Sequence, residues 1–170
     1  DMTTLAGLTG SGNAYAITKA GQKAEADLKL ALAYTSNLGR RTSILATIAH
    51  NREMNLKDDD AALEAYRQNY ESRGSIGASD EFRSLQGAAR ILARRGKFDE
   101  AISVIHRANI DKQKGYWRHA MQLTLAETLS AAGRKDEALK VYRRVQSDES
   151  ARKVHRDAAD KAIKLLGAGN

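Results

Sequence analysis

The chain has 170 residues, and its 28 Lys and Arg residues outnumber its 21 Asp and Glu residues, which gives a net charge of +7. This length is that of one domain. Because the chain contains no cysteine, a disulfide framework, a thiolate metal site and a thiol redox sensor are excluded. The absence of proline and an aromatic content of 5% favour helix throughout, and no apolar run approaches the roughly 18 residues that span a membrane.

No sequence pattern in the amino-terminal segment predicts a helix or a strand. Residues 1–12 contain Gly7, Gly10 and Gly12, and we expect a flexible lead here. No basic region followed by an apolar stretch is present, so the chain shows no targeting element and leaves its compartment unknown. Since it begins at Asp1, we expect a fragment or processed form of a longer protein.

The rest of the chain is predicted to form helix pairs in a single domain over residues 1–170. Four pairs are expected at about 13–40, 43–76, 82–115 and 119–150. They share a small residue just inside the second helix, and these residues are 36, 39 and 37 positions apart: Ala26, Ala62, Ala101 and Ala138. Residues 151–166 form a charged amphipathic segment that is predicted to be a capping helix, because stacked repeats need a polar end.

The third and fourth pairs repeat most clearly. Gly-Lys-Phe-Asp-Glu-Ala-Ile at residues 96–102 returns as Gly-Arg-Lys-Asp-Glu-Ala-Leu at residues 133–139. Glycine at these positions is predicted to end the first helix, since it enters the left-handed cap conformation without a side-chain penalty. The acidic pair then starts the second helix at the positive end of its dipole. An ordinary helical bundle is the alternative, which the repeated phase disfavours.

Over residues 7–152 the sequence resembles the tetratricopeptide repeat family, as about four divergent repeats. The shared features are the helix, the turn and the second helix with its small residue, as in units 82–115 and 119–150. The resemblance implies an all-α, right-handed solenoid of antiparallel helix pairs. It also implies a concave groove, lined by the first helices, that binds a segment of a partner protein.

No arrangement of residues predicts an enzyme. His50 and Glu53 lie one helical turn apart, but no third metal ligand is identifiable, and an exposed helical pair is the simpler interpretation. Asp58, Asp59 and Asp60 precede a helix and are expected to cap it. We therefore predict no catalytic residue, no metal site, no cofactor and no small-molecule substrate.

The excess charge lies in the carboxyl-terminal half. Residues 1–80 have a net charge of −1 and residues 81–170 one of +8. Arginines spaced by 7 and 4 positions share one face of the first helix of the third pair, and the predicted groove consists of Arg83, Gln86, Arg90, Arg94 and Glu127. A basic groove predicts a protein or peptide partner with an acidic segment, because complementary charges attract.

Two further interpretations stay open at this point. The basic half could bind single-stranded RNA, although the arginine face lacks the interleaved aromatic residues that stack on bases. Tyr116 and Trp117, just before the first helix of the fourth pair, could anchor a partner peptide. The simpler interpretation is that they pack one helix pair onto the next, and we favour it.

Overall fold

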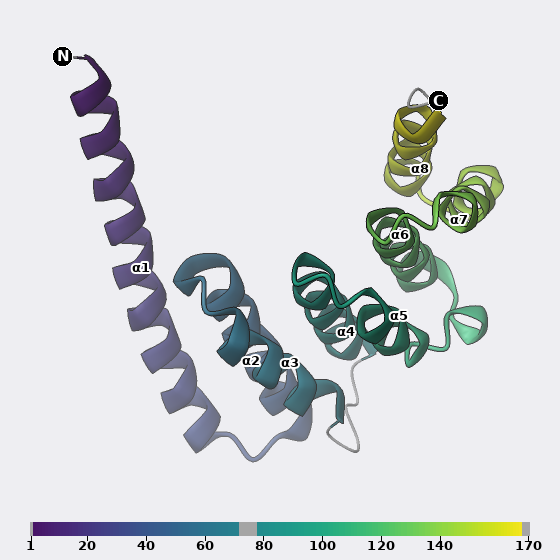
Figure 1. Cartoon of the computed structure of the whole chain (residues 1–170). Coiled ribbons are helices and arrows are strands. Elements are labelled where there is room, and N and C mark those ends of the chain that lie inside the picture. Colours follow the sequence, from purple (N-terminus) through teal and green to yellow (C-terminus); the bar gives the residue numbers. More distant parts are fainter. Residues whose placement is uncertain (1, 72–77, 168–170) are drawn as a thin grey trace. The chain divides into compact units, whose positions relative to one another are not determined.

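The computed structural model describes residues 2–71 and 78–167, and everything regular within these ranges is helical (Figure 1). The chain forms two compact units, Asp1–Glu81 and Phe82–Asn170. No helix in the described ranges is long and apolar enough to cross a membrane. Residue 1 of the expected lead and the end of the second expected repeat, 72–76, lie outside the described residues, as do residues 77 and 168–170.

The described residues of unit 1 up to Glu71 form three α-helices and a short π-helix. Helices α1 (Met2–Tyr34), α2 (Leu38–Asn51) and α3 (Asp59–Glu71) follow one another, and the π-helix η1 (Arg52–Leu56) extends α2. Lys57 follows η1 in the left-handed conformation, with φ of 56°. The pair α2 and α3 lies where the sequence predicts the second repeat.

Helix α1 corrects the prediction for the start of the chain. One continuous helix, Met2–Tyr34, occupies most of both the expected flexible lead at 1–12 and the expected helix pair at 13–40. Gly21, in the middle of the expected first pair, is buried within α1, and a Cβ atom there would lie 2.9 Å from Cδ2 of Leu56. The buried side-chain amide of Asn51 donates a hydrogen bond of 2.9 Å to the carbonyl of Gly21. Glycine therefore serves a close helix crossing here and not a helix end.

A largely buried ion pair joins α1 to η1. Arg52 donates to Oε1 of Glu25 at 2.8 Å and to the carbonyl of Ala61 at 3.2 Å, and Lys29 also contacts Glu25 at 2.8 Å. The hydrogen bond from Arg52 is the main reason why the pKa of Glu25 falls to about 2. Unit 1 is therefore held together by this ion pair as well as by apolar packing. Removing one of the two charges would leave the other without its partner and would destabilise the unit.

Unit 2 consists of antiparallel helix pairs followed by one more helix. The first of these helices, α4, begins at Ala78, within the last residues of unit 1. In chain order the elements are α4 (Ala78–Arg94), α5 (Phe98–His106), the short 3₁₀ turn η2 (Ile110–Lys112), α6 (Gly115–Ala131), α7 (Lys135–Ser147) and α8 (Lys153–Gly167). The pairs α4/α5 and α6/α7 occupy the positions of the third and fourth expected repeats, and α8 occupies that of the capping helix.

The same cap ends both α4 and α6. Gly96 and Gly133 have φ values of 73° and 76°. The amide of the residue after each glycine donates to a carbonyl five residues earlier, from Lys97 to Leu92 at 3.0 Å and from Arg134 to Leu129 at 2.9 Å. This is the Schellman arrangement, which satisfies carbonyl groups at a helix end and favours glycine. The repeated sequence therefore specifies a repeated turn.

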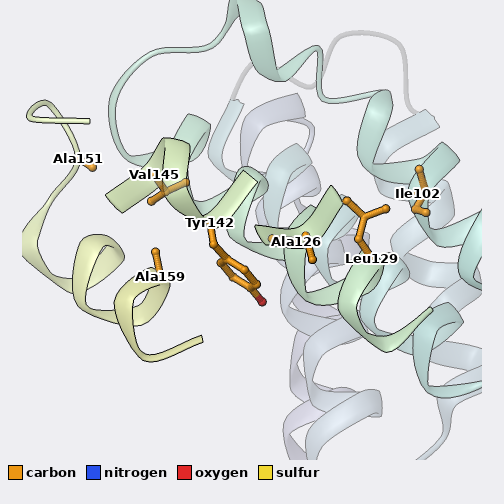
Figure 2. Packing of buried hydrophobic residues seen from close by; sticks show 8 residues of the cluster. Ile102, Ala126, Leu129, Tyr142, Val145, Ala151 and Ala159 are labelled. Atoms are coloured by element: carbon orange, nitrogen blue, oxygen red, sulfur yellow. The ribbon is translucent and has the colours of Figure 1, made fainter. Parts of the chain in front are cut away.

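The core of unit 2 continues from one helix pair to the next (Figure 2). Its carboxyl-terminal part contains Tyr142 and Val145 of α7 packed against α6 and α8. Ala101 and Ala138, the small residues of the two second helices, are both fully buried. Ala159 of α8 is also fully buried, so α8 covers the apolar face that the last pair would otherwise expose.

Candidate functional site

A groove of about 370 Å³ lies between α4 and α6, the first helices of the two pairs in unit 2. We call it the α4–α6 groove. Four of the five predicted groove residues line it, together with small residues and two threonines; the full lining is Gln86, Arg90, Ala93, Arg94, Thr124, Glu127, Thr128 and Ala131. Arg83 lies on the same helix but is not among the lining residues.

Hydrogen bonds fix one end of the groove. The side-chain nitrogen of Gln86 donates to Oγ1 of Thr124 at 2.9 Å and to the carbonyl of Ala120 at 3.4 Å. Thr124 uses its own hydroxyl hydrogen on Ala120, so its oxygen must accept from Gln86. Thr128 likewise donates to the carbonyl of Thr124 at 2.8 Å. These bonds hold the amide of Gln86 in one orientation and leave its oxygen and that of Thr128 as acceptors.

Both signs of charge meet along the groove. Arg90 and Arg94 are exposed at its α4 side, and Glu127 faces them from α6. Glu127 as a whole is exposed, but partial desolvation of its carboxyl group raises its pKa above the usual value, and the positive charge of Arg90 partly opposes this shift. Glu127 in turn contributes to raising the pKa of Tyr142 to about 12, behind the larger effect of burial. The carboxyl group of Glu127 therefore protonates more readily than an ordinary glutamate.

Four groove residues were not predicted: Ala93, Thr124, Thr128 and Ala131. Three of them lie on α6 within four positions of Glu127. Applying to α6 the same helical spacing that identified the arginines of α4 selects these residues, since positions three and four apart share a helix face. The prediction thus missed most of the α6 wall of the groove, where it had included Glu127 alone, and Ala93 on the α4 wall.

Tyr116 and Trp117 pack within unit 2. The ring of Trp117 stacks on Phe82 of α4 with centroids 5.5 Å apart, and Tyr116 meets Trp117 edge-on at 4.9 Å. Tyr116 also lies 4.9 Å from the ring of His155 in α8, beneath the guanidinium of Arg152. These contacts link α4, α6 and α8, as the packing interpretation expects. The role of this pair as a partner anchor stays a prediction.

Two buried histidines lie beside these rings. His119 of α6 is 1% exposed, and its Nε2 lies 3.0 Å from Oδ2 of Asp148. Hydrogen bonds from Ser150 and then from His119 hold the pKa of Asp148 well below its usual value. His155 is 6% exposed and its ring centroid lies 5.9 Å from that of His119. Nothing in the sequence spacing of these residues indicates that they meet.

We expect the free energy of unfolding of unit 2 to decrease as the pH falls below about 6.5. Burial, followed by the nearby His119 and Arg152, lowers the pKa of His155. The unfolded chain therefore binds a proton at this residue more readily than the folded chain, so acid favours unfolding. Urea unfolding at pH 7.5 and 5.5, followed by the fluorescence of Trp117, measures the difference.

The control for this prediction is His155→Gln, which removes the titrating ring and keeps a polar side chain. The groups that surround His155 remain in place, namely His119 and Tyr116 of α6, Arg152 ahead of α8, and Asp148 through its contact with His119. The variant should lose less stability on acidification than the parent chain. An equal loss in both proteins would assign the effect to other groups.

The other sequence candidates have structural roles. Glu53 is buried and accepts a hydrogen bond of 2.9 Å from the hydroxyl of Tyr66, whereas His50 is exposed, so the two do not form the exposed pair that was expected. Asp58 caps α3 by accepting from the amide of Ala61 at 2.9 Å, as predicted. Among the residues whose placement is described, no group of three or more potential ligands could hold a metal ion.

Repeated antiparallel helix pairs with identical caps, a continuous core and a final covering helix define unit 2 as a helical repeat array. The family model of the tetratricopeptide repeat matches residues 84–115, which span most of α4 and all of α5 and η2. Residues 84–115 are therefore similar to a tetratricopeptide repeat, a module that generally mediates protein–protein interaction and is not catalytic. No curated protein and no solved structure matches the chain.

Proposed function

We propose that the chain is a non-catalytic scaffold whose α4–α6 groove binds an acidic peptide segment of a partner protein. The observation that carries this proposal is the meeting of Arg90, Arg94, Gln86 and Glu127 on a single groove between the first helices of successive pairs. Tetratricopeptide repeats, to one of which residues 84–115 are similar, generally mediate protein–protein interaction. The acidic partner and the use of this groove are the proposed steps.

The chemistry of the groove suits an extended acidic segment. Arg90 and Arg94 present planar guanidinium groups, which bind carboxylates through paired hydrogen bonds. The small side chains of Ala93 and Ala131 allow a peptide backbone to approach α4 and α6 closely. The oxygens of Gln86 and Thr128 can accept hydrogen bonds from its backbone amides. The arginines thus favour acidic side chains, while the amide and hydroxyl oxygens hold the main chain.

Glu127 makes the affinity of this groove for an acidic ligand depend on pH. A carboxylate bound at Arg90 would share the groove with Glu127, and two like charges close together favour protonation of one of them. Because partial desolvation already raises the pKa of the Glu127 carboxyl group, this proton is taken up at modest cost. Acidic peptides should therefore bind more tightly as the pH is lowered toward the range in which Glu127 protonates, provided that the peptide itself remains charged.

Single-stranded RNA is the second candidate ligand, because unit 2 holds the basic excess of the chain. Binding to single strands relies on aromatic rings that stack on successive bases. The residues that line the groove include no aromatic side chain, and the rings of Tyr116 and Trp117 contact Phe82 and His155 instead. These contacts favour a peptide over RNA.

Fluorescence anisotropy with two labelled peptides tests the proposal on the full chain. One peptide alternates Glu with Leu, and the other carries Gln in place of each Glu. We expect the acidic peptide to bind, its affinity to fall between about 0.05 and 0.15 M salt, and the uncharged peptide to bind far less. A single-stranded RNA is the comparison ligand. Tight RNA binding at about 0.15 M salt without binding of the acidic peptide would replace the scaffold proposal by the nucleic-acid one.

A further inference from the structure

Two buried imidazole rings meet where the first turn of α8 lies against α6. His119 of α6 is 1% exposed, His155 of α8 is 6% exposed, and their ring centroids are 5.9 Å apart. The ring of His155 also lies 4.9 Å from the ring of Tyr116 in α6. Histidine is the side chain that most readily gains a positive charge between neutral and mildly acidic pH. The contact between α6 and α8 therefore includes groups that respond to acid.

The surroundings of His155 suit its neutral form. Its Nδ1 atom is buried and has no hydrogen-bond partner among the described residues. A neutral imidazole leaves one of its two nitrogens without a proton, whereas the charged ring carries an N–H on both. The charged ring of His155 would thus place a donor at a buried position that offers no acceptor. Burial of a charge without a partner is costly, so a proton on His155 opposes the packing of α8 on α6.

The charges that face His155 add to this opposition. Arg152 lies in the connection before α8, and His119 faces the ring from α6. The acidic group of this cluster, Asp148, is occupied elsewhere, because its Oδ2 atom lies 3.0 Å from Nε2 of His119 and 3.9 Å from the guanidinium of Arg118. Burial, followed by His119 and Arg152, accordingly lowers the pKa of His155. A proton on His155 meets positive charge where a carboxylate would be needed to stabilise it.

Helix α8 is held on unit 2 by a small apolar contact. Ala159 is fully buried beside the core residues of α7 (Figure 2), and Ile163 and Leu166 are only partly buried against the same core. An exposed hydrogen bond of 2.9 Å also joins Gln146 of α7 to Asp160. Because α8 follows both helix pairs of the unit, it can leave without breaking the contacts within them. Elements at the end of a fold open at a lower free energy than the whole domain.

We propose that α8 is a proton-released cap on the end of the repeat array. Protonation of His155 shifts α8 from the docked state, packed on α6 and α7, toward a released state in which α4 to α7 keep their fold. In the released state the ring lies in water and binds its proton more tightly, so acid favours release. Release uncovers Tyr142 and Val145 of α7, which share a core cluster with Ala159. Acid therefore opens the carboxyl-terminal end of the array.

Hydrogen exchange of the full chain at pH 7.5 and 5.5 tests this proposal. Protection is expressed relative to the intrinsic exchange rate at each pH, in the regime in which exchange follows the opening equilibrium. We expect the protection of α8 to fall by up to about tenfold on acidification, since the released ring has an ordinary pKa near about 6.5 and takes up one proton. At both pH values α8 should be at least about tenfold less protected than α4 and α6, because it opens alone.

Two results of this measurement would overturn the proposal. Equal protection of α8, α4 and α6 at pH 5.5 would show that α8 opens only when the whole unit unfolds. Protection of α8 that does not change with pH would show that its docking is not linked to a proton.

Three substitutions separate the titration of His155 from a structural role. His155→Gln removes the titrating ring, so the protection of α8 should no longer depend on pH. Arg152→Gln removes a positive charge that faces the ring and should make the fall in protection smaller, which the loss of a purely structural contact would not do. His106→Gln, at an exposed position of α5, should retain the pH dependence of the parent chain.

The Arg152→Gln comparison decides even where His155→Gln loosens α8 at both pH values. It compares the change with pH within one variant and does not depend on how firmly α8 is docked at neutral pH. A fall in protection as large as that of the parent chain, in either His155→Gln or Arg152→Gln, would assign the effect to other groups and contradict the proposal.

Discussion

Ala138→Leu is expected to lower the free energy of unfolding of unit 2 by about 1–3 kcal/mol. Ala138 is fully buried in the core that joins α6, α7 and α8, together with Tyr142 and Val145. Three added side-chain carbons have no space there, so the helices must separate or neighbouring side chains must leave their preferred rotamers. Ala101→Leu should act in the same way one repeat earlier, because Ala101 is equally buried in α5.

Trp117 is the only tryptophan of the chain, and its position in α6 makes its fluorescence a measure of unit 2. Urea unfolding of each variant, followed by this signal, gives the change in free energy. The matched control is Ala158→Leu, which makes the same substitution at an exposed position of α8 and should change stability by no more than about 0.5 kcal/mol. If the two buried variants unfolded at the same urea concentration as the parent, the alanines would not mark tight helix crossings.

The sequence predicts the helix pairs of unit 2 well because each local signal there serves one purpose. Gly96 and Gly133 end helices in the left-handed conformation that glycine favours, and the residues that follow make the same backbone bonds. Ala101 and Ala138 are buried where the repeat places them. When local preference and packing agree in this way, a short motif determines a whole turn and the helix that follows it.

Unit 1 is predicted less well because its signals are ambiguous. Gly21 lies five positions before Ala26, the same spacing that the two helix-ending glycines of unit 2 have from their alanines, yet it allows α1 to approach Leu56 and Asn51 closely. Glycine serves both purposes, and the choice depends on a partner about 30 positions away. The ion pair between Glu25 and Arg52 is likewise a contact between distant positions. Helical periodicity contains no information about such pairs.

The groove was predicted mainly on its α4 wall, and Glu127 was the one residue predicted on α6. Arginine spacing selects Arg90 and Arg94 on α4, and the structure places both at the α4–α6 groove. Arg83 shares their helix face but lies outside the lining, because a face extends along the whole helix while a groove extends only as far as the neighbouring helix. The cluster of His119, Asp148 and His155 could not be predicted, since it depends on how α8 returns to α6.

Arg90→Glu is expected to weaken binding of the acidic peptide by at least about tenfold, which corresponds to about 1.4 kcal/mol. The substitution removes a guanidinium from the groove and places a second carboxylate opposite Glu127, so a ligand carboxylate would meet repulsion where it now meets attraction. Arg90→Lys keeps the charge but loses the planar paired geometry, and should therefore bind with intermediate affinity. Glu127→Gln should strengthen binding and reduce its dependence on pH, because the repelling carboxylate is gone.

Arg143→Glu is the matched control for Arg90→Glu, since it makes the same change in net charge at an exposed position of α7 that does not line the groove. Long-range attraction of an acidic ligand depends on the total charge, and both variants should slow association to a similar extent. Only Arg90→Glu should also speed dissociation, because only it changes a direct contact with the ligand. Measured association and dissociation rates therefore separate the two effects. If both variants altered only the association rate, Arg90 would act through its charge at a distance, and the peptide would bind elsewhere on the basic surface.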